Sequence, residues 1–157
     1  MADQYKKPYL DSSVFIAWIK GEVEKGVKRK EIVEHILFLA EKGIYIVVTS
    51  ALTLAEVHKR KGASKLAEKE DERILSYFEH EFIQIVDVDR ETGEMANKLC
   101  REHASDKLMP NDAIHLASAL RAKCDALLAW DEVLSKLKRS DIRCEEPIMI
   151  GQGKLDL

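Results

Sequence analysis

Residues 7–20 read KPYLDSSVFIAWIK, and this stretch predicts a short strand followed at once by a helix. "KPYL" is strand-like, and "SSVFIAWIKG" is typical of a helix that ends at Gly21. Asp11 lies between the two, with apolar residues on both sides. A carboxylate in such surroundings costs free energy unless it has a partner. Two interpretations are open: Asp11 caps the helix, alone or with Ser12 or Ser13, or it binds a metal ion at the end of the strand.

The remaining sequence continues this alternation of strands and helices. Strands are predicted over 44–49, 82–88 and 126–130, and the first of these is a continuous β-branched run, as in strands buried on both faces. Helices are predicted over 28–43, 50–62, 64–81, 90–104, 110–124 and 131–139, with a last edge strand over 145–150. The pattern predicts an α/β sandwich with a mainly parallel central sheet. In such sheets, function gathers at the carboxyl ends of the strands.

Length and composition indicate one folded domain over residues 1–157, with 46% hydrophobic and 34% charged residues. The formal net charge of −3 gives no general attraction for nucleic acid, so a polyanion would need local basic patches or bound cations.

Cys100, Cys124 and Cys144 lack metal-binding or redox spacing, which favours reduced thiols. The sequence has no apolar run of membrane-span length and does not begin like a secretory signal, so we expect a cytoplasmic protein.

Most of the 28 acidic residues lie in charge-rich helical stretches, and four stand out from them. Asp11 and Asp131 follow predicted strands, and Asp112 lies in the first turn of a predicted helix. Each of these aspartates could cap a helix or complement its dipole. Glu56 lies about two turns into its predicted helix among apolar neighbours, too deep to cap it, and would need a cation.

Four carboxylates at one edge of a sheet would repel one another and raise each other's pKa values. A bound divalent cation would offset this repulsion. Because the ligand set is entirely oxygen, Mg²⁺ or Mn²⁺ is favoured over zinc.

Four sequence blocks together resemble the PIN domain family, in particular the VapC-type toxins and related PIN ribonucleases: "YLDSSVFIAW", "TSALTLAEV", "PNDAIHLASAL" and "LLAWDEVL". The resemblance extends from Pro8 to Ile150. It implies a three-layer α/β/α sandwich and metal-dependent hydrolysis of phosphodiesters, usually in RNA. It also implies a homodimer and a small antitoxin protein that blocks the acidic pocket.

The same resemblance assigns the core acids to Asp11, Glu56 and Asp112, and the fourth acid to Asp131. We expect Asp11 and Asp112 to be direct ligands of Mg²⁺ or Mn²⁺. Glu56 would complete the shell or orient the attacking water, and Asp131 would hold a second ion or a metal-bound water. The family often has Ser or Thr two residues before the fourth acid. This chain has Ala129 there, so a hydroxyl that would help position a metal, a water or that acid is absent.

Two other classes of function remain open. A non-catalytic PIN module that binds RNA or a protein partner would suit Ala129 and the acidic composition. A phosphotransferase with Asp11 as nucleophile is disfavoured, because such enzymes generally carry a second Asp two residues later, where this chain has Ser13.

Further residues have both a structural and a functional interpretation. His115 lies one turn after Asp112, and we expect it to pack beside the core or to form a local hydrogen bond rather than to bind metal. Asn111 is expected to cap its helix or to touch substrate. Trp18 and Trp130 are expected in the core or an interface, with base stacking as the alternative. Several basic residues either contact phosphate groups of a nucleic acid or only complement the dipole at the end of a helix. They are His58–Lys61, Lys28–Lys30, Lys107, Arg121 and Lys136–Arg139.

Overall fold

A single parallel sheet forms the centre of this computed structural model, which describes residues 5–21, 23–24, 27–57 and 68–148. Its strands, in the order β5-β4-β1-β6-β7, are β5 (Ile83–Val86), β4 (Val47–Ser50), β1 (Pro8–Leu10), β6 (Ala126–Leu128) and β7 (Arg143–Glu145). All four neighbouring pairs are parallel. The predicted sheet is therefore confirmed, with β1 in the middle.

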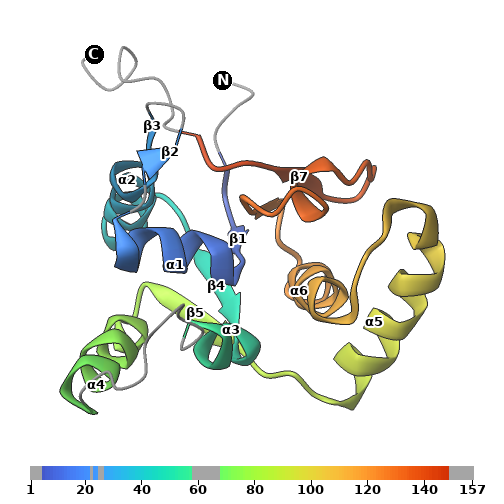
Figure 1. The fold of residues 1–157 in the computed structure, drawn as a ribbon, viewed down its shortest axis with the longest axis horizontal. Coiled ribbons are helices and arrows are strands. Elements are labelled where there is room, and N and C mark those ends of the chain that lie inside the picture. The colour runs from blue at the N-terminus through green and yellow to red at the C-terminus, as the bar shows by residue number, and fades with distance from the viewer. Residues whose placement is uncertain (1–4, 22, 25–26, 58–67, 149–157) are drawn as a thin grey trace.

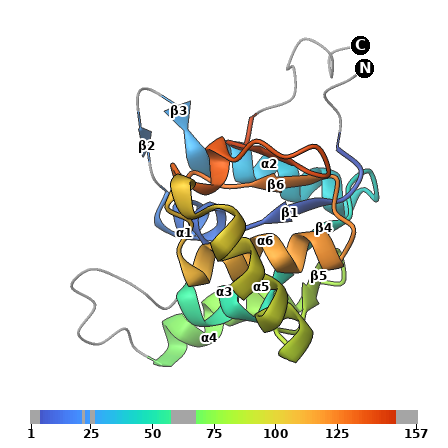
Figure 2. The ribbon, with the colours of Figure 1, turned by 90° about the vertical axis from the view of Figure 1, so that its right-hand side faces the viewer.

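Helices cover both faces of the sheet (Figure 1). One face carries α1 (Ser12–Lys20), α2 (Arg29–Glu41), α3 (Ala51–Glu56) and α4 (Glu68–Ser76), and the other carries α5 (Arg90–Glu102) and α6 (Pro110–Arg121). Figure 2 views the second face, with α5 in front of α6 and the strands behind. This arrangement is the predicted three-layer α/β/α sandwich.

The core lies in two layers, one on each face of the sheet. Because side chains alternate along a strand, Leu10 and Leu128 pack with α1 and α2, whereas Tyr9 and Leu127 pack with α5 and α6. All four side chains have no exposed surface. Burial on both faces explains why these strands are apolar throughout.

Several predicted boundaries differ from the structure. The last strand is β7 rather than 145–150 and ends before Pro147. The predicted helix 131–139 is reduced to a single 3-10 turn, Leu134–Lys136. Of the predicted helix 50–62, α3 ends at Glu56, and residues 58–62 lie outside the described residues. A two-stranded antiparallel hairpin, β2 (Val23–Glu24) and β3 (Val27–Lys28), was not expected from the sequence.

Two hydrogen bonds align the carboxyl ends of three adjacent strands. Thr49 Oγ1 of β4 donates to the Leu10 carbonyl at 2.7 Å. The Asp11 N–H donates to the Leu128 carbonyl of β6 at 3.2 Å. The residues that follow β1 and β6 therefore emerge next to each other at one edge of the sheet. Within the described ranges, no helix is long and apolar enough to span a membrane.

Candidate functional site

Asp11 occupies the N-cap position of α1, but its side chain makes no capping hydrogen bond. Asp11 is only 3% exposed, and its carboxylate instead accepts a hydrogen bond from the Ser13 hydroxyl at 2.5 Å. The same hydroxyl accepts the Trp130 N–H at 3.0 Å and so connects Asp11 to the end of β6. Burial raises the pKa of Asp11 to about 6, and the charge of Asp131 acts in the same direction. Helix capping therefore does not explain this carboxylate.

Asp112 is the second buried carboxylate, in the first turn of α6. Burial raises its pKa to about 6, and the negative charges of Asp131 and Glu56 add to the effect, while His115 opposes it. Since Asp131 raises the pKa of both Asp11 and Asp112, its carboxylate lies within electrostatic range of both.

Asp131 itself has a structural role as well as this electrostatic one. Its Oδ1 accepts the N–H groups of Val133 at 2.7 Å and Leu134 at 3.0 Å. These bonds satisfy the backbone of a tight turn, and the turn replaces the predicted helix. Asp131 thus holds a turn rather than the N-cap of a helix, because Val133 takes the N-cap position of the 3-10 turn, and the charge of Asp131 still acts on Asp11 and Asp112.

Glu56 is the last residue of α3 and is held by hydrogen bonds from three side chains. Oε1 accepts His115 Nε2 at 2.6 Å and the Ser12 hydroxyl at 3.2 Å, and Oε2 accepts Asn111 Nδ2 at 3.4 Å. Burial acts to raise the pKa of Glu56, but the hydrogen bond and charge of His115, with help from Asn111 and Ser12, lower it overall. Glu56 thus has a partner without any cation.

His115 belongs to this site, which the sequence did not reveal. It is only 1% exposed, as expected for a residue packed beside the core. Its hydrogen bonds are not local, however: Nε2 meets Glu56, and Nδ1 meets the Tyr9 hydroxyl at 2.7 Å across 106 positions of sequence. The available signal was that His115 lies three residues after Asp112, on the same face of a helix. The expected cap Asn111 is also corrected, because Met109 holds the N-cap position of α6.

Ala129, where the family often has a hydroxyl, is fully buried in the core between the sheet and α6. Its N–H donates to the Glu145 carbonyl of β7 at 3.1 Å. The hydroxyl found at the junction of β1 and β6 is that of Ser13.

The donors fit a hard divalent cation by their chemistry, because they are carboxylates in a partly water-excluded place. Among the residues that the structure describes, no three His, Cys, Asp or Glu side chains are already arranged as a metal-binding group. The carboxylates would have to draw together around an ion. The three cysteines are free thiols, and burial raises the pKa of Cys124 to about 12 and that of Cys144 to about 11.

The basic residues proposed for phosphate contact are mostly engaged elsewhere. Arg121 lies in the last turn of α6, at the end away from Asp112, and pairs with Asp89 and Glu91, which favours its interpretation as a complement to the helix end. Lys28 and Lys30 pair with acids of their own helix, at 3.5 and 3.9 Å. Arg29 lies over the Trp130 ring, 4.7 Å from its centroid. Trp18 packs against Tyr77, with ring centroids 4.6 Å apart. His58–Lys61 lie outside the described residues, and Lys107 is exposed.

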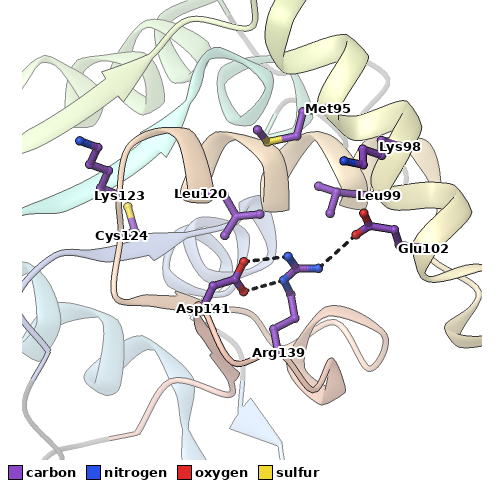
Figure 3. A pocket seen from close by; sticks show the side chains of 9 residues that line it. All are labelled: Met95, Lys98, Leu99, Glu102, Leu120, Lys123, Cys124, Arg139 and Asp141. Atoms are coloured by element: carbon purple, nitrogen blue, oxygen red, sulfur yellow. Dashed lines mark hydrogen bonds and ion pairs between the residues drawn. The ribbon is translucent and has the colours of Figure 1, made fainter.

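A cavity of about 540 Å³ lies away from these acids, between α5, the end of α6 and residues 139–141 (Figure 3). Arg139 sits between Asp141, at 2.8 Å, and Glu102, at 3.7 Å, so its charge is neutralised within the cavity wall. None of the four predicted acids lines this cavity. The candidate site is therefore the acidic edge of the sheet.

The fold and this edge define a class: a parallel α/β/α sandwich with carboxylates gathered at the carboxyl ends of its central strands. The family model for the PIN domain matches residues 9–140. The chain belongs to the PIN domain family.

Solved structures with a similar fold include a VapC toxin, VapBC2 and a further toxin–antitoxin complex. VapC20 of Mycobacterium tuberculosis, described as a sarcin–ricin loop cleaving toxin, gives a TM-score of 0.59 at 15% identity over 79% of this chain and 89% of that one. VapBC2 of Rickettsia felis, bound to a DNA fragment from its promoter, gives a TM-score of 0.62 at 19% identity and covers 89% of this chain and 98% of that one. A toxin–antitoxin complex from Klebsiella pneumoniae gives a TM-score of 0.60 at 19% identity and covers 87% of this chain and 98% of that one. Comparison with curated protein sequences gives no significant match.

Proposed function

We propose that this protein is a ribonuclease dependent on Mg²⁺ or Mn²⁺, and the toxin of a toxin–antitoxin pair. The observation that carries the proposal is the pair of buried carboxylates, Asp11 and Asp112, each with a pKa raised to about 6 mainly by burial and in part by the charge of Asp131. Carboxylates that burial and mutual repulsion make costly to ionise are common at functional sites. A divalent cation would remove that cost.

Asp11 and Asp112 would hold the metal ion directly. Asp131 would support a second ion or a bound water with the oxygen that its turn leaves free. Glu56, held as a carboxylate by His115, would complete the shell or accept a proton from the attacking water. The bound ion would supply Lewis-acid stabilisation of the phosphate and a water of lowered pKa.

RNA is the proposed substrate because the resemblance to PIN ribonucleases implies hydrolysis of phosphodiesters, usually in RNA, and because VapC20 is described as cleaving the sarcin–ricin loop. With a net charge of −3, the protein as a whole would not attract a polyanion, so the bound cations would carry much of the attraction at the site. The VapBC and Klebsiella complexes support a small antitoxin as partner. A homodimer, a cytoplasmic location and a single domain over residues 1–157 complete the proposal.

The test compares RNA cleavage, with Mn²⁺ and with Mg²⁺, by the unaltered protein, Asp112→Asn and Asp87→Asn. Asp87 is an exposed aspartate just after β5, the outer strand two positions from β1, and is none of the four predicted acids, so it provides a matched control. We expect cleavage that EDTA abolishes, loss of cleavage in Asp112→Asn, and normal cleavage in Asp87→Asn.

Equal cleavage by Asp112→Asn and the unaltered protein would refute the metal centre. Binding of RNA without cleavage in any metal would favour the alternative, a non-catalytic PIN module. The toxin assignment has its own test: a small neighbouring gene should encode a DNA-binding protein that inhibits this one.

A further inference from the structure

A buried chain of hydrogen bonds runs from β1 through α6 to Glu56. The Tyr9 hydroxyl meets His115 Nδ1 at 2.7 Å, and His115 Nε2 meets Glu56 Oε1 at 2.6 Å. Tyr9 and His115 are 0% and 1% exposed, and their rings also make an edge contact with centroids 5.8 Å apart. The two residues are therefore fixed by the core, whereas the Glu56 side chain is 20% exposed at the site.

The geometry of the three groups engages both nitrogens of the imidazole ring. Glu56 Oε1 lies within hydrogen-bond distance of His115 Nε2, and a carboxylate oxygen accepts, so Nε2 donates. The Tyr9 hydroxyl can either donate to Nδ1 or accept from Nδ1–H, so the second bond forms in either protonation state of the ring. Both imidazole nitrogens are then engaged, so His115 is neither a metal ligand nor a general base in this arrangement.

The bonds also distinguish the two oxygens of Glu56. Oε1 accepts two hydrogen bonds, from His115 and from Ser12 at 3.2 Å. Oε2 accepts one long hydrogen bond from the part of the chain that the structure describes, at 3.4 Å from the Asn111 amide. Oε2 is therefore the oxygen with free lone pairs. Its carboxylate group also lies close enough to Asp112 to raise the pKa of that residue.

We propose that Tyr9 and His115 are positioning residues that hold Glu56 by Oε1 and leave Oε2 to serve the metal ion or its water. This inference rests on the proposed metal-dependent function and adds the residues that act through Glu56. Partners that orient a ligand in this way typically change metal affinity by ~10- to 100-fold when they are removed.

The test is calorimetric titration of Mn²⁺ into the purified protein and its variants, well below their unfolding temperatures. Tyr9→Phe keeps the buried ring and removes only the hydroxyl. His115→Gln retains an amide N–H that can reach Glu56, whereas His115→Leu cannot donate at all. We expect weaker Mn²⁺ binding in all three, by ~10-fold for Tyr9→Phe and up to ~100-fold for His115→Leu, with His115→Gln in between.

Tyr45→Phe is the matched control, because it also removes a buried tyrosine hydroxyl. Among the described residues this hydroxyl has no hydrogen-bond partner, and Tyr45 lies before the amino end of β4, opposite the edge where the acids lie. The Mn²⁺ affinity of Tyr45→Phe should equal that of the unaltered protein. A purely structural role of Tyr9 and His115 would lower thermal stability but leave the Mn²⁺ affinity of the folded variants unchanged, and that result would overturn the inference. If His115→Leu does not fold, the Mn²⁺ affinities of Tyr9→Phe and His115→Gln still test the positioning role.

Asp112→Asn separates this inference from the proposed function. If Asp112→Asn loses Mn²⁺ binding while Tyr9→Phe and His115→Gln bind normally, the metal centre stands and only the positioning role fails. If Asp112→Asn binds as well as the unaltered protein, the metal centre is wrong, and the positioning role is overturned with it.

Discussion

Replacing Asp11 by Asn should stabilise the metal-free protein at neutral pH. The carboxylate is 3% exposed and has its pKa raised from 3.8 to about 6, mainly by burial. An Asn side chain removes the charge and can still accept the Ser13 hydroxyl through its amide oxygen. The substitution should therefore remove an electrostatic cost while keeping the local hydrogen bond.

The size of the effect follows from the linkage between protonation and folding. At ~1.4 kcal/mol per pKa unit, a shift from 3.8 to about 6 corresponds to ~3 kcal/mol when the group is fully ionised. Because the pKa is raised in the folded state, the native protein binds more protons than the unfolded chain between these values, and its stability falls as pH rises through this window. Burying the Asn amide will offset part of the gain, so we expect Asp11→Asn to add ~1–3 kcal/mol at pH 7.5.

The assay is urea unfolding in EDTA at pH 7.5 and, as far as the protein stays folded, near pH 4. The gain in Asp11→Asn should be present at pH 7.5 and nearly absent near pH 4, where the wild-type carboxyl is protonated in the folded state. Asp89→Asn is the matched control of opposite sign. Asp89 also occupies an N-cap, but it is exposed, and its hydrogen bonds to Thr92 and pairing with Arg121 lower its pKa.

Asp89→Asn should therefore be no more stable than the unaltered protein at pH 7.5. A loss of stability in Asp11→Asn at pH 7.5 without metal would show that the Asp11 carboxylate contributes to the fold, and would refute the argument.

Three further predictions concern the metal and the sheet. Saturating Mn²⁺ should raise the Tm much more at pH 7.5 than at pH 5, because protons compete for Asp11 and Asp112, whose pKa values are raised to about 6; equal shifts in scanning calorimetry would contradict this. Thr49→Val should cost ~1–3 kcal/mol in urea unfolding, since it leaves the Leu10 carbonyl without the 2.7 Å hydrogen bond from β4, and an unchanged midpoint would count against that contact. Leu127→Ala should cost ~2–5 kcal/mol, because the side chain is 0% exposed on β6; a loss well below 1 kcal/mol would mean that the core refills the space.

Much of the acidic edge could be predicted from the sequence. Asp11 directly follows β1 and Asp131 lies three residues after the end of β6. These two strands are adjacent and parallel, so their carboxyl ends meet at one edge. Asp112 was expected in the first turn of a helix, and it lies there. These are consequences of local pattern and of the right-handed, parallel connection of strands.

Other features depend on competition between local and tertiary forces, and the sequence pattern misled there. Residues 131–139 have a helical pattern, but the Asp131 side chain holds the N–H groups of Val133 and Leu134 in a turn. The chain must then reach β7, which pairs with β6 from Arg143 onward. Tertiary pairing therefore limits the helix to one 3-10 turn.

The sequence by itself thus determined the layers, the parallel sheet and the edge where the carboxylates gather, because strand and helix periodicity and the order of elements are local properties of the chain. Only the tertiary structure decided which side chains form hydrogen bonds with each carboxylate. Tyr9, Glu56 and His115 come from a strand and two helices on opposite faces of the sheet, and no spacing between them indicates contact. Their hydrogen bonds exist because packing of α3 and α6 at one sheet edge brings distant side chains within 3 Å, and that packing is a property of the whole core.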